Sequence, residues 1–383
     1  MRFRTDDMQT EKPYIDYSMI FVVLFLLCFG LIMVYSTSSY EASMSVVTEN
    51  DPAYYLKKQV FATIVGIVFM IISSIVPYHF YEKISTTAYF VSLILIVLVL
   101  TPLGYAANGA RRWLRIGISV QPAEIAKVAI IIFGAGLICK MKDSINTWKG
   151  FGIAIAPAGI AALLVWQITD NMSSAIIIGG ISFLMIFVAS KDYKRFALMI
   201  SGLLAFGALM VFVIQKAAGS GKFGFRGARI LAWLDPEAFA SGTGFQTLQA
   251  LYAIGSGGIF GKGLGQSIQK QGFLPEAQND MIFSIICEEL GLFGGICIIL
   301  MFIILLWRMM IVANNAKDLY GALLVVGVMS HIAIQVVLNI AVVTNTIPNT
   351  GISLPFISYG GTSVMFLLVE IGLVINVARS IKI

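Results

Sequence analysis

The sequence predicts an all-α polytopic membrane protein, and three observations support this fold class. Of its 383 residues, 58% are hydrophobic and only 12% are charged, and the mean hydropathy is +0.88. Ten apolar stretches occur, each close to the ~20 residues that a helix needs to cross a bilayer. Backbone groups in lipid have no water to bond, so these stretches must be helices. We expect one transmembrane domain over residues 1–383.

The ten predicted spans follow one another along the chain, and a long loop separates the seventh from the eighth. Their ranges are 17–36, 58–76, 86–103, 122–139, 150–168, 173–190, 196–215, 281–307, 318–341 and 361–378. An even number of spans places both termini on one side of the membrane. Lysine and arginine concentrate on that side, so the positive-inside rule puts both termini in the cytoplasm. The long loop, residues 216–280, is then a large extracytoplasmic segment.

Cysteine and histidine are scarce, which limits the chemistry that the chain can perform. The four cysteines fall in apolar stretches or at their ends and are typical of small hydrophobic residues rather than of disulfides or metal sites: Cys28, Cys139, Cys287 and Cys297. Two histidines, His79 and His331, argue against a histidine metal cage or a Ser-His-Asp triad. We expect no cleavable signal peptide, because a full-length span follows the polar start without a small-residue cleavage pattern.

Asp280 lies where the glycine-rich end of the long loop meets the apolar stretch 281–307. An acid at the mouth of a membrane helix is more often functional than an acid on a protein surface. A carboxylate that is free to accept a proton can act as a general base on a hydroxyl. The alternative is a solvated acid that caps the start of a helix. We take Asp280 as the candidate catalytic residue.

Several cations lie on the predicted outer side, where the topology rule disfavours them in short loops. Arg111 and Arg112 belong to the short loop after the third span. The long loop adds Arg226, Arg229 and Lys262. Arginine binds phosphate in bidentate fashion, so these cations are candidate ligands for a phosphate-bearing substrate. The alternative is contact with anionic lipid headgroups.

Lys127 and Glu124 form a second charged feature, inside the fourth span. They are three residues apart and therefore share one helix face. Charges within a membrane are costly and usually face a partner or a wet cavity, so Lys127 is a second candidate catalytic residue and Glu124 a candidate substrate contact. The alternative is a local Glu124–Lys127 pair with a snorkelling lysine. Glu370, deep in the last span, receives no role.

An acid facing cations at a lipid boundary suits a substrate with a phosphate head and an apolar tail. Glycosyl transfer from a lipid pyrophosphate fits this description, because cations stabilise the departing pyrophosphate and the base activates the attacking hydroxyl. One base with one in-line displacement would invert the anomeric centre, with no second carboxylate as a nucleophile. No metal-ligand cluster is evident; a Mg²⁺ or Mn²⁺ ion beside the pyrophosphate stays open.

Four long motifs occur in an order that resembles one protein family. They are GARRWLRIG…QPAEIAK (109–127), DPEAFASGTGFQTLQALYAIGSGGIFGKGLGQS (235–267), QKQGFLPEAQNDMIFSIICEELGLFGG (269–295) and NTGISLPFISYGGTS (349–363). The chain resembles the SEDS family (shape, elongation, division and sporulation proteins), whose branches are named FtsW, RodA and SpoVE. The resemblance runs from about Asp16 to Arg379 and is closer to the FtsW and SpoVE branch.

The resemblance implies ten transmembrane helices and peptidoglycan glycosyltransfer, in which lipid II is polymerised into glycan strands outside the bacterial cytoplasmic membrane. It implies lipid II and the growing strand as substrates and a class B penicillin-binding protein as a partner. Other division or elongation membrane proteins are implied as further partners, with no nucleic acid. The FtsW and SpoVE likeness favours division or sporulation over side-wall elongation.

The resemblance also transfers roles to particular residues. The essential loop aspartate of the family falls on Asp280, its fourth-helix lysine on Lys127, and its outer-loop arginines on Arg111 and Arg112. Two further residues of the matched motifs are candidate substrate contacts: Gln278 and Ser358. The family often has Pro-Asp-Leu-Gly-Thr between the fifth and sixth helices, whereas this chain has DNMSS (170–174), so Asp170 receives no role.

Two other function classes compete with an enzyme. A transporter that flips lipid II would favour polar residues at midplane depth and paired inverted repeats, and the sequence shows no such repeat. A scaffold that positions a synthase without chemistry of its own would tolerate loss of the Asp280 carboxylate.

Overall fold

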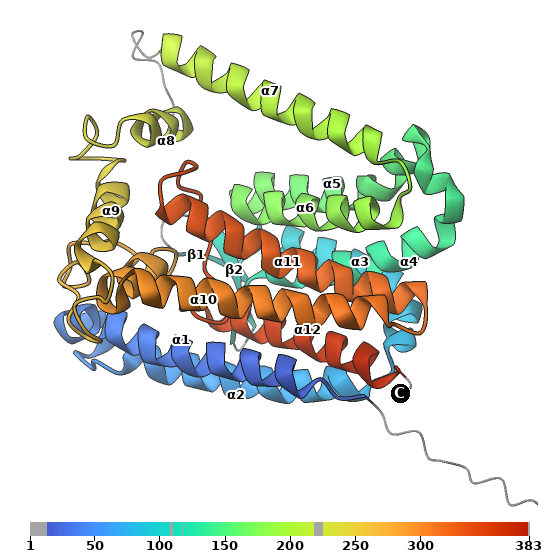
Figure 1. Ribbon diagram of the computed structural model, residues 1–383, viewed down its shortest axis with the longest axis horizontal. Helices are drawn as coiled ribbons and strands as arrows, with labels where there is room; N and C mark the ends of the chain where they lie inside the picture. Colours follow the sequence, from blue (N-terminus) through green and yellow to red (C-terminus); the bar gives the residue numbers. More distant parts are fainter. Residues whose placement is uncertain (1–13, 108–109, 117, 218–224, 382–383) are drawn as a thin grey trace, which may run out of the picture.

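The computed structural model describes residues 14–107, 110–116, 118–217 and 225–381, and it is mostly helical (Figure 1). Within this part of the chain, ten helices are long and apolar enough to cross a membrane. They are α1 Tyr17–Met44, α2 Tyr54–Ile75, α3 Tyr78–Leu98, α4 Pro122–Met141, α5 Trp148–Thr169, α6 Met172–Ala189, α7 Tyr193–Ala217, α10 Ile282–Asn314, α11 Leu319–Val343 and α12 Gly361–Arg379. Each overlaps one predicted span, so the predicted fold class is confirmed.

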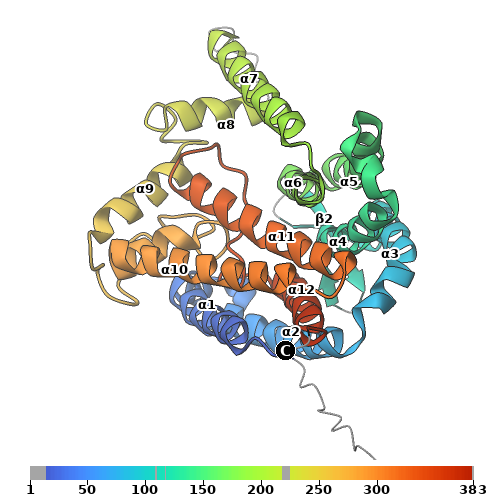
Figure 2. The same cartoon turned by 45° about the vertical axis from the view of Figure 1, so that its right-hand side comes forward.

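The spans pack side by side as a bundle, with α4, α11 and α12 at its centre. These three helices bury most of their apolar length inside the protein, whereas α2, α3 and α5 bury far less. Helix α11 contacts α10, α6, α4 and α12, and Figure 2 shows it in the middle of the bundle. The outer helices expose large apolar side chains, as expected for helices that face lipid.

Helix α7 is the exception to this packing. Its first turn carries the buried residues Arg195 and Phe196, but no residue from 197 to 216 is buried. In Figures 1 and 2 the helix leans away from the other spans over most of its length. The Arg195 guanidinium donates to the carbonyls of Thr147 and Ile145 at 2.8 and 3.1 Å, which fixes this first turn to the bundle.

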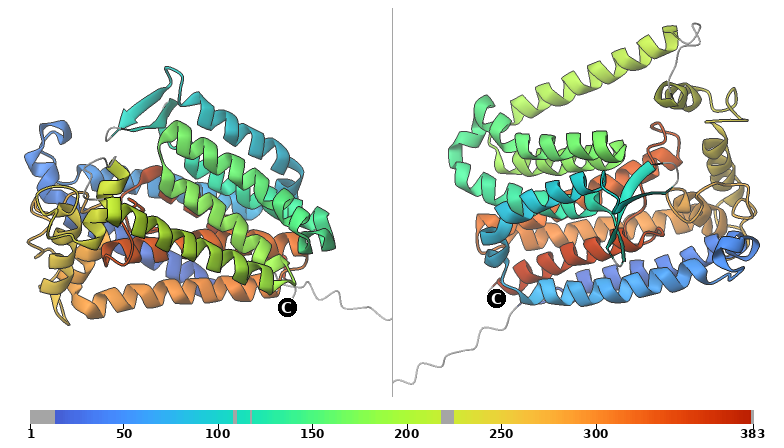
Figure 3. Two further views of the ribbon diagram at one scale, coloured as in Figure 1. Left: turned by 90° about the horizontal axis from the view of Figure 1, so that it is seen from above. Right: turned by 180° about the vertical axis from the view of Figure 1, so that it is seen from behind.

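The segment 104–121, predicted as a short outer loop, contains a three-stranded antiparallel sheet. The strands are β1 Gly104–Ala107, β2 Ala110–Ile116 and β3 Ile118–Val120, in the order β1-β2-β3. The sheet lies beside the ends of α3 and α4 (Figure 3). Strand β3 is tied to α12, because the Thr362 hydroxyl donates to the Ser119 carbonyl at 2.9 Å.

The long loop contains two helices, α8 Phe225–Leu234 and α9 Phe245–Gly257, and α9 packs against α10. Helix α10 is interrupted at Gly291, whose φ of 71° and ψ of −172° are not helical. The freed backbone groups bond to the loop: the amides of Lys262 and Gly263 donate to the carbonyls of Glu288 and Glu289 at 3.0 and 2.9 Å. The interruption is therefore satisfied by protein, as a membrane requires.

Close approach of backbones explains the glycine-rich run GSGGIFGKGLG. A Cβ on Gly257 would lie 2.0 Å from the Cys287 carbonyl oxygen, and one on Gly261 would lie 2.2 Å from that of Glu289. These glycines let the loop backbone reach the interrupted helix. The run therefore serves close packing of the loop against α10.

Candidate active site

Asp280 lies at the end of the bundle where the long loop enters α10. Its side chain is only 8% exposed, so it is not a solvated acid. The N-cap of α10 is Met281, and no side chain caps this helix start by a hydrogen bond. Asp280 Oδ1 is buried and has no hydrogen-bond partner among the described residues. The helix-capping alternative is therefore not supported, and one carboxylate oxygen remains available to accept a proton.

Burial raises the pKa of the Asp280 carboxyl to about 7. Removal from water disfavours the charged form and is the largest cause. The negative charge of Glu276 acts in the same direction, and the positive charge of Arg229 opposes both. A base with a pKa near the working pH combines availability with proton affinity, which is the optimum for general base catalysis.

Backbone contacts hold the segment that carries Asp280. Glu276 takes a left-handed conformation with φ of 56°, and its carbonyl accepts from the amides of Asn279 and Met281 at 3.0 and 3.3 Å. From α11, the Asn339 side-chain amide donates to the Asp280 carbonyl at 2.7 Å. Asn339 was not among the residues predicted from the sequence, although a polar residue within an apolar span is a signal for a functional or structural site.

The loop between α11 and α12 forms a second wall beside the acid. A Cβ on Gly351 would lie 3.7 Å from Asp280 Oδ2, so the carboxylate lies against this backbone. The loop is held from α11, where Asn339 Nδ2 donates to the Ile352 carbonyl at 2.6 Å and Gln335 Nε2 to the Ser353 carbonyl at 3.0 Å. The site thus joins segments that are about 70 residues apart in sequence.

Among the predicted cations, Arg229 acts on Asp280, because its positive charge lowers the pKa of that carboxyl. Its Nη1 donates to the Asn349 carbonyl at 3.4 Å, at the edge of the same loop. It also lines a cavity of about 150 Å³ between α8, α9 and Asn349, together with Trp233 and Gln246. A cation, amides and an aromatic ring suit a polar ligand such as a sugar phosphate. The Arg226 side chain lies outside the part that the structure describes.

Arg111 and Arg112 bind backbone carbonyls in the described part of the structure. Arg111 donates to the carbonyls of Thr101 and Gly104, with Nη2 distances of 2.6 and 2.8 Å. Arg112 donates to the Thr169 carbonyl at 3.1 Å and to the Asp170 carbonyl at 2.8 Å, at the end of α5. These bonds fix the sheet to the ends of α3 and α5. Binding of pyrophosphate by either arginine stays a prediction.

Lys127 and Glu124 form the local ion pair that was the alternative interpretation of these charges. Lys127 Nζ lies 2.7 Å from Glu124 Oε1, and both side chains are buried, so the lysine does not snorkel. Glu124 Oε2 is buried without a hydrogen-bond partner among the described residues. No described contact joins this pair to Asp280, and its catalytic and substrate roles stay predictions.

Lys262 pairs with an acid of α10. Its Nζ lies 2.7 Å from Oε1 of Glu288, a carboxylate with 0% exposure. One residue further on, Glu289 Oε1 lies 2.6 Å from Lys270 Nζ, and its carboxylate also accepts from the Ser36 hydroxyl. These two pairs fasten the loop to the first part of α10. A substrate contact by Lys262 stays a prediction. The ammonium group would then have to bind both Glu288 and the substrate.

Gln278 and Ser358 lie close to Asp280 in the fold, but their described contacts are internal. Gln278 Nε2 donates to Glu41 at 3.0 Å, and its carbonyl accepts from the Tyr359 amide at 2.9 Å. The Ser358 hydroxyl accepts from the Leu354 amide at 2.7 Å. Both side chains are buried, so they support the two walls of the site. A direct substrate contact by either residue stays a prediction.

Glu370, which received no role from the sequence, has a partner in the structure. His331 Nδ1 of α11 lies 2.8 Å from Glu370 Oε2 of α12, and both side chains are buried. The pair joins two central helices within the membrane-spanning region, where an isolated carboxylate would be very costly.

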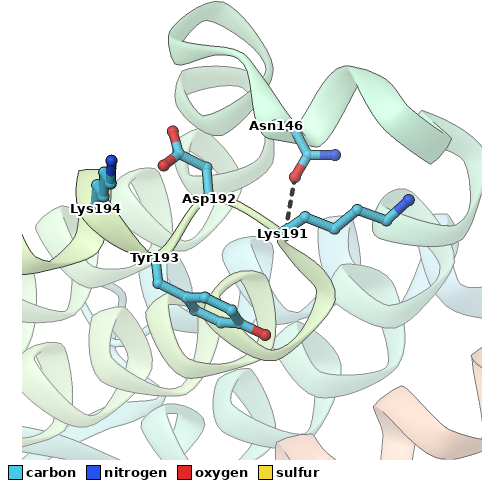
Figure 4. A pocket seen from close by; sticks show the side chains of 5 residues that line it. All are labelled: Asn146, Lys191, Asp192, Tyr193 and Lys194. Carbon is cyan, nitrogen blue, oxygen red and sulfur yellow. Dashed lines mark hydrogen bonds between the residues drawn. The ribbon is translucent and has the colours of Figure 1, made fainter.

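A second cavity lies at the other end of the bundle from Asp280. It measures about 620 Å³ and is lined by Asn146, Lys191, Asp192, Tyr193 and Lys194 (Figure 4). The Lys191 amide donates to Asn146 Oδ1 at 2.8 Å, and the Lys191 side chain is 86% exposed. This is an open hollow at the start of α7, and it brings together none of the predicted site residues.

No group of three or more His, Cys, Asp or Glu residues that could hold a metal ion occurs in the described part of the chain. Among the described residues, Asp280 is the one carboxylate at the site that is buried and has an oxygen without a hydrogen-bond partner. Mg²⁺ is often bound by one or two carboxylates together with substrate phosphates, so a cation that arrives with pyrophosphate fits this donor set. Its involvement stays a prediction.

Together, these features define a polytopic membrane protein with one candidate catalytic centre, at one end of its helix bundle. The chain belongs to the FtsW/RodA/SpoVE family, whose sequence model, described as a cell cycle protein, matches residues 17–383. It is 38% identical to stage V sporulation protein E of Bacillus subtilis, over 97% of this chain and 99% of that protein. The probable peptidoglycan glycosyltransferase FtsW of Trichlorobacter lovleyi is 37% identical, over 97% and 96%.

Solved structures share the fold. A chain from a peptidoglycan synthase complex aligns with a TM-score of 0.76 and 23% identity, over 95% of this chain and 98% of that chain. The rod shape determining protein RodA of Thermus thermophilus aligns with a TM-score of 0.65 and 23% identity, over 95% and 97%. At this identity the likeness concerns the fold alone. The predicted membership in the SEDS family is confirmed by the sequence relatives.

Proposed function

We propose that this protein is a peptidoglycan glycosyltransferase that polymerises lipid II into glycan strands on the outer face of the bacterial cytoplasmic membrane. The observation that carries the proposal is Asp280, a buried acid at the mouth of a membrane helix with one unpartnered carboxylate oxygen among the described residues and a pKa of about 7. Relatives named as probable peptidoglycan glycosyltransferases support the reaction class.

In the proposed reaction Asp280 acts as the general base. It takes the proton of the acceptor sugar hydroxyl while that oxygen forms a bond to the anomeric carbon of the lipid-linked donor. The bond from the anomeric carbon to the pyrophosphate oxygen breaks, and undecaprenyl pyrophosphate leaves with the electron pair. One in-line displacement inverts the anomeric centre, so no covalent glycosyl intermediate forms on a second carboxylate.

Cations around this end of the bundle would stabilise the leaving pyrophosphate. Arg229 has the strongest support, because its charge acts on Asp280 and its side chain lines the polar cavity. Arg111 and Arg112 would use the guanidinium hydrogens that their carbonyl partners leave free. A Mg²⁺ or Mn²⁺ ion would neutralise the same charge.

We propose a class B penicillin-binding protein as the partner that cross-links the strands, in division or sporulation. The likeness in fold to a chain of a synthase complex, whose work is described as coordinating polymerization and crosslinking, supports this partner class. Similarity to a stage V sporulation protein and to FtsW proteins supports the cellular role. Both termini would lie in the cytoplasm, and Asp280 on the outer side.

Reconstitution of the purified full chain separates the three function classes. Fluorescent lipid II is supplied in proteoliposomes, with glycan length followed on gels and lipid translocation followed by quenching of the outer-leaflet dye. We expect glycan strands from the wild-type protein, alone or with its transpeptidase partner. Translocation without polymer would identify a transporter, and neither activity in the presence of the partner would identify a scaffold.

A further inference from the structure

Asn339 of α11 joins the two walls of the candidate site. Its Nδ2 donates to the Asp280 carbonyl at 2.7 Å and to the Ile352 carbonyl at 2.6 Å. Resting on the proposed function, we infer that Asn339 is a positioning residue: it fixes the Asp280 backbone against the 350–353 loop, so that the carboxylate meets the substrate hydroxyl in one geometry.

The orientation of the Asn339 amide follows from its neighbours. Both partners are carbonyl oxygens, which can only accept, so the NH₂ group must face them and both of its hydrogens are used. Asn339 Oδ1 is buried and has no hydrogen-bond partner among the described residues. The side chain is 0% exposed. The described hydrogen bonds of this side chain thus all go to these two backbone carbonyls. A buried amide at membrane depth would be costly without such bonds.

The positions of the two carbonyls that accept these hydrogen bonds explain why Asn339 matters for catalysis. The Asp280 carbonyl belongs to the same residue as the reacting carboxylate, and Ile352 adjoins Gly351, against which Asp280 Oδ2 lies. One side chain therefore sets the distance between the acid and the loop beside it. Misplacement of a reacting group by about 1 Å can cost about 100-fold in rate.

Gln335 provides a matched control, four residues earlier on the same face of α11. It holds the same loop by donating to the Ser353 carbonyl and hydroxyl at 3.0 and 3.3 Å, and it is also buried. None of its described bonds reaches the Asp280 segment. A role in loop stability alone would be shared by Gln335 and Asn339, whereas a role in positioning Asp280 belongs to Asn339.

The experiment compares purified wild-type protein with Asn339→Leu, Gln335→Leu and Asp280→Asn, using fluorescent lipid II as the probe over a range of pH. We expect Asn339→Leu to lower kcat by ~10-fold or more, with KM for lipid II within about threefold of wild type. The pH at which its rate is half-maximal on the acidic side (the midpoint) should fall, because a loosened segment lets water reach the Asp280 carboxylate. Gln335→Leu should keep the wild-type midpoint.

If Asn339→Leu cannot be purified, Asn339→Ser takes its place, because serine keeps one hydrogen-bond donor. Its rate is then measured over the same range of pH. Wild-type kcat and midpoint in the Asn339 variant would overturn the inference, as would the same midpoint shift in Gln335→Leu. An active Asp280→Asn protein would overturn the proposed base instead. Inactive Asp280→Asn beside a wild-type-like Asn339→Leu would reject the positioning role alone.

Discussion

Asp280 differs from a surface carboxylate because nearly all of its side chain is removed from water. Its position between a glycine-rich loop and an apolar stretch predicts an acid at the mouth of a membrane helix. Its shifted pKa could not be predicted, because it depends on how deeply the fold buries the carboxyl and on the charges of Glu276 and Arg229. Gly351, against which Asp280 Oδ2 lies, comes from about 70 residues away. Local sequence indicates which acid to examine, and tertiary contacts set its proton affinity.

The raised pKa predicts how activity depends on pH. A base must be deprotonated to act, and Asp280 is protonated below a pH of about 7. The value of kcat/KM for lipid II should therefore rise with pH and level off above about 7, falling roughly tenfold per pH unit well below it. The measurement is initial polymerisation rate from about pH 5.5 to 8.5. A flat profile across this range would contradict a general base whose pKa lies near neutrality.

At the scale of elements, the interrupted helix α10 and the loop around it form one unit. The ten spans could be predicted, since apolar length alone specifies them. The interruption at Gly291 and the sheet over 104–107, 110–116 and 118–120 could not. The interruption depends on backbone bonds with residues 258–263 of the loop, and the sheet depends on the register of its three strands. The glycine-rich run was visible as a composition signal, but its purpose depends on how close α10 comes to it.

Two glycines of α9 test this packing as a matched pair. A Cβ on Gly257 would meet the Cys287 carbonyl oxygen at 2.0 Å, whereas one on Gly255 would meet nothing within 4 Å. We expect Gly257→Ala to destabilise the protein by ~1–3 kcal/mol through overpacking. Gly255→Ala should be neutral or stabilising by up to ~1 kcal/mol, because alanine favours the helix. Thermal unfolding in detergent measures both; equal effects would show that α9 does not press on α10.

Lys262 allows the predicted substrate contact to be separated from the observed ion pair. Lys262→Met leaves the fully buried Glu288 carboxylate without its cation, so the unfolding temperature should fall. Lys262→Met combined with Glu288→Gln should recover part of the loss, because the uncompensated charge is gone. The exposed Lys149→Met serves as a control. An unchanged unfolding temperature with a raised KM would instead support a substrate contact.

At the scale of the whole molecule, composition and span count determine the fold class, but not how the spans pack. Helix α7 shows the difference, since it has the apolarity of a span yet none of its residues from 197 to 216 is buried. Hydrophobicity specifies that a helix belongs in the membrane, whereas shape and small polar contacts specify its neighbours. Arg195 at the base of α7 is one such contact.

Labelling of single cysteines tests the predicted orientation of the bundle. In a variant without the four native cysteines, Ala238→Cys in the long loop should react with an impermeant maleimide added to intact cells. Asp143→Cys, whose parent side chain is 91% exposed at the other end of the bundle, should react only after permeabilisation. Labelling of both positions in intact cells would contradict the ten-span topology with cytoplasmic termini.

The most direct test of Asp280 as the base is the polymerisation rate of purified Asp280→Asn beside the wild-type protein, with lipid II binding measured on the same samples. Asparagine keeps the shape of the side chain and loses only its capacity to accept the proton. We expect unchanged lipid II binding and a rate lower by ~10²–10⁴, the usual contribution of a general base. Polymerisation within a few-fold of wild type would contradict a general base at this position and remove Asp280 from the mechanism.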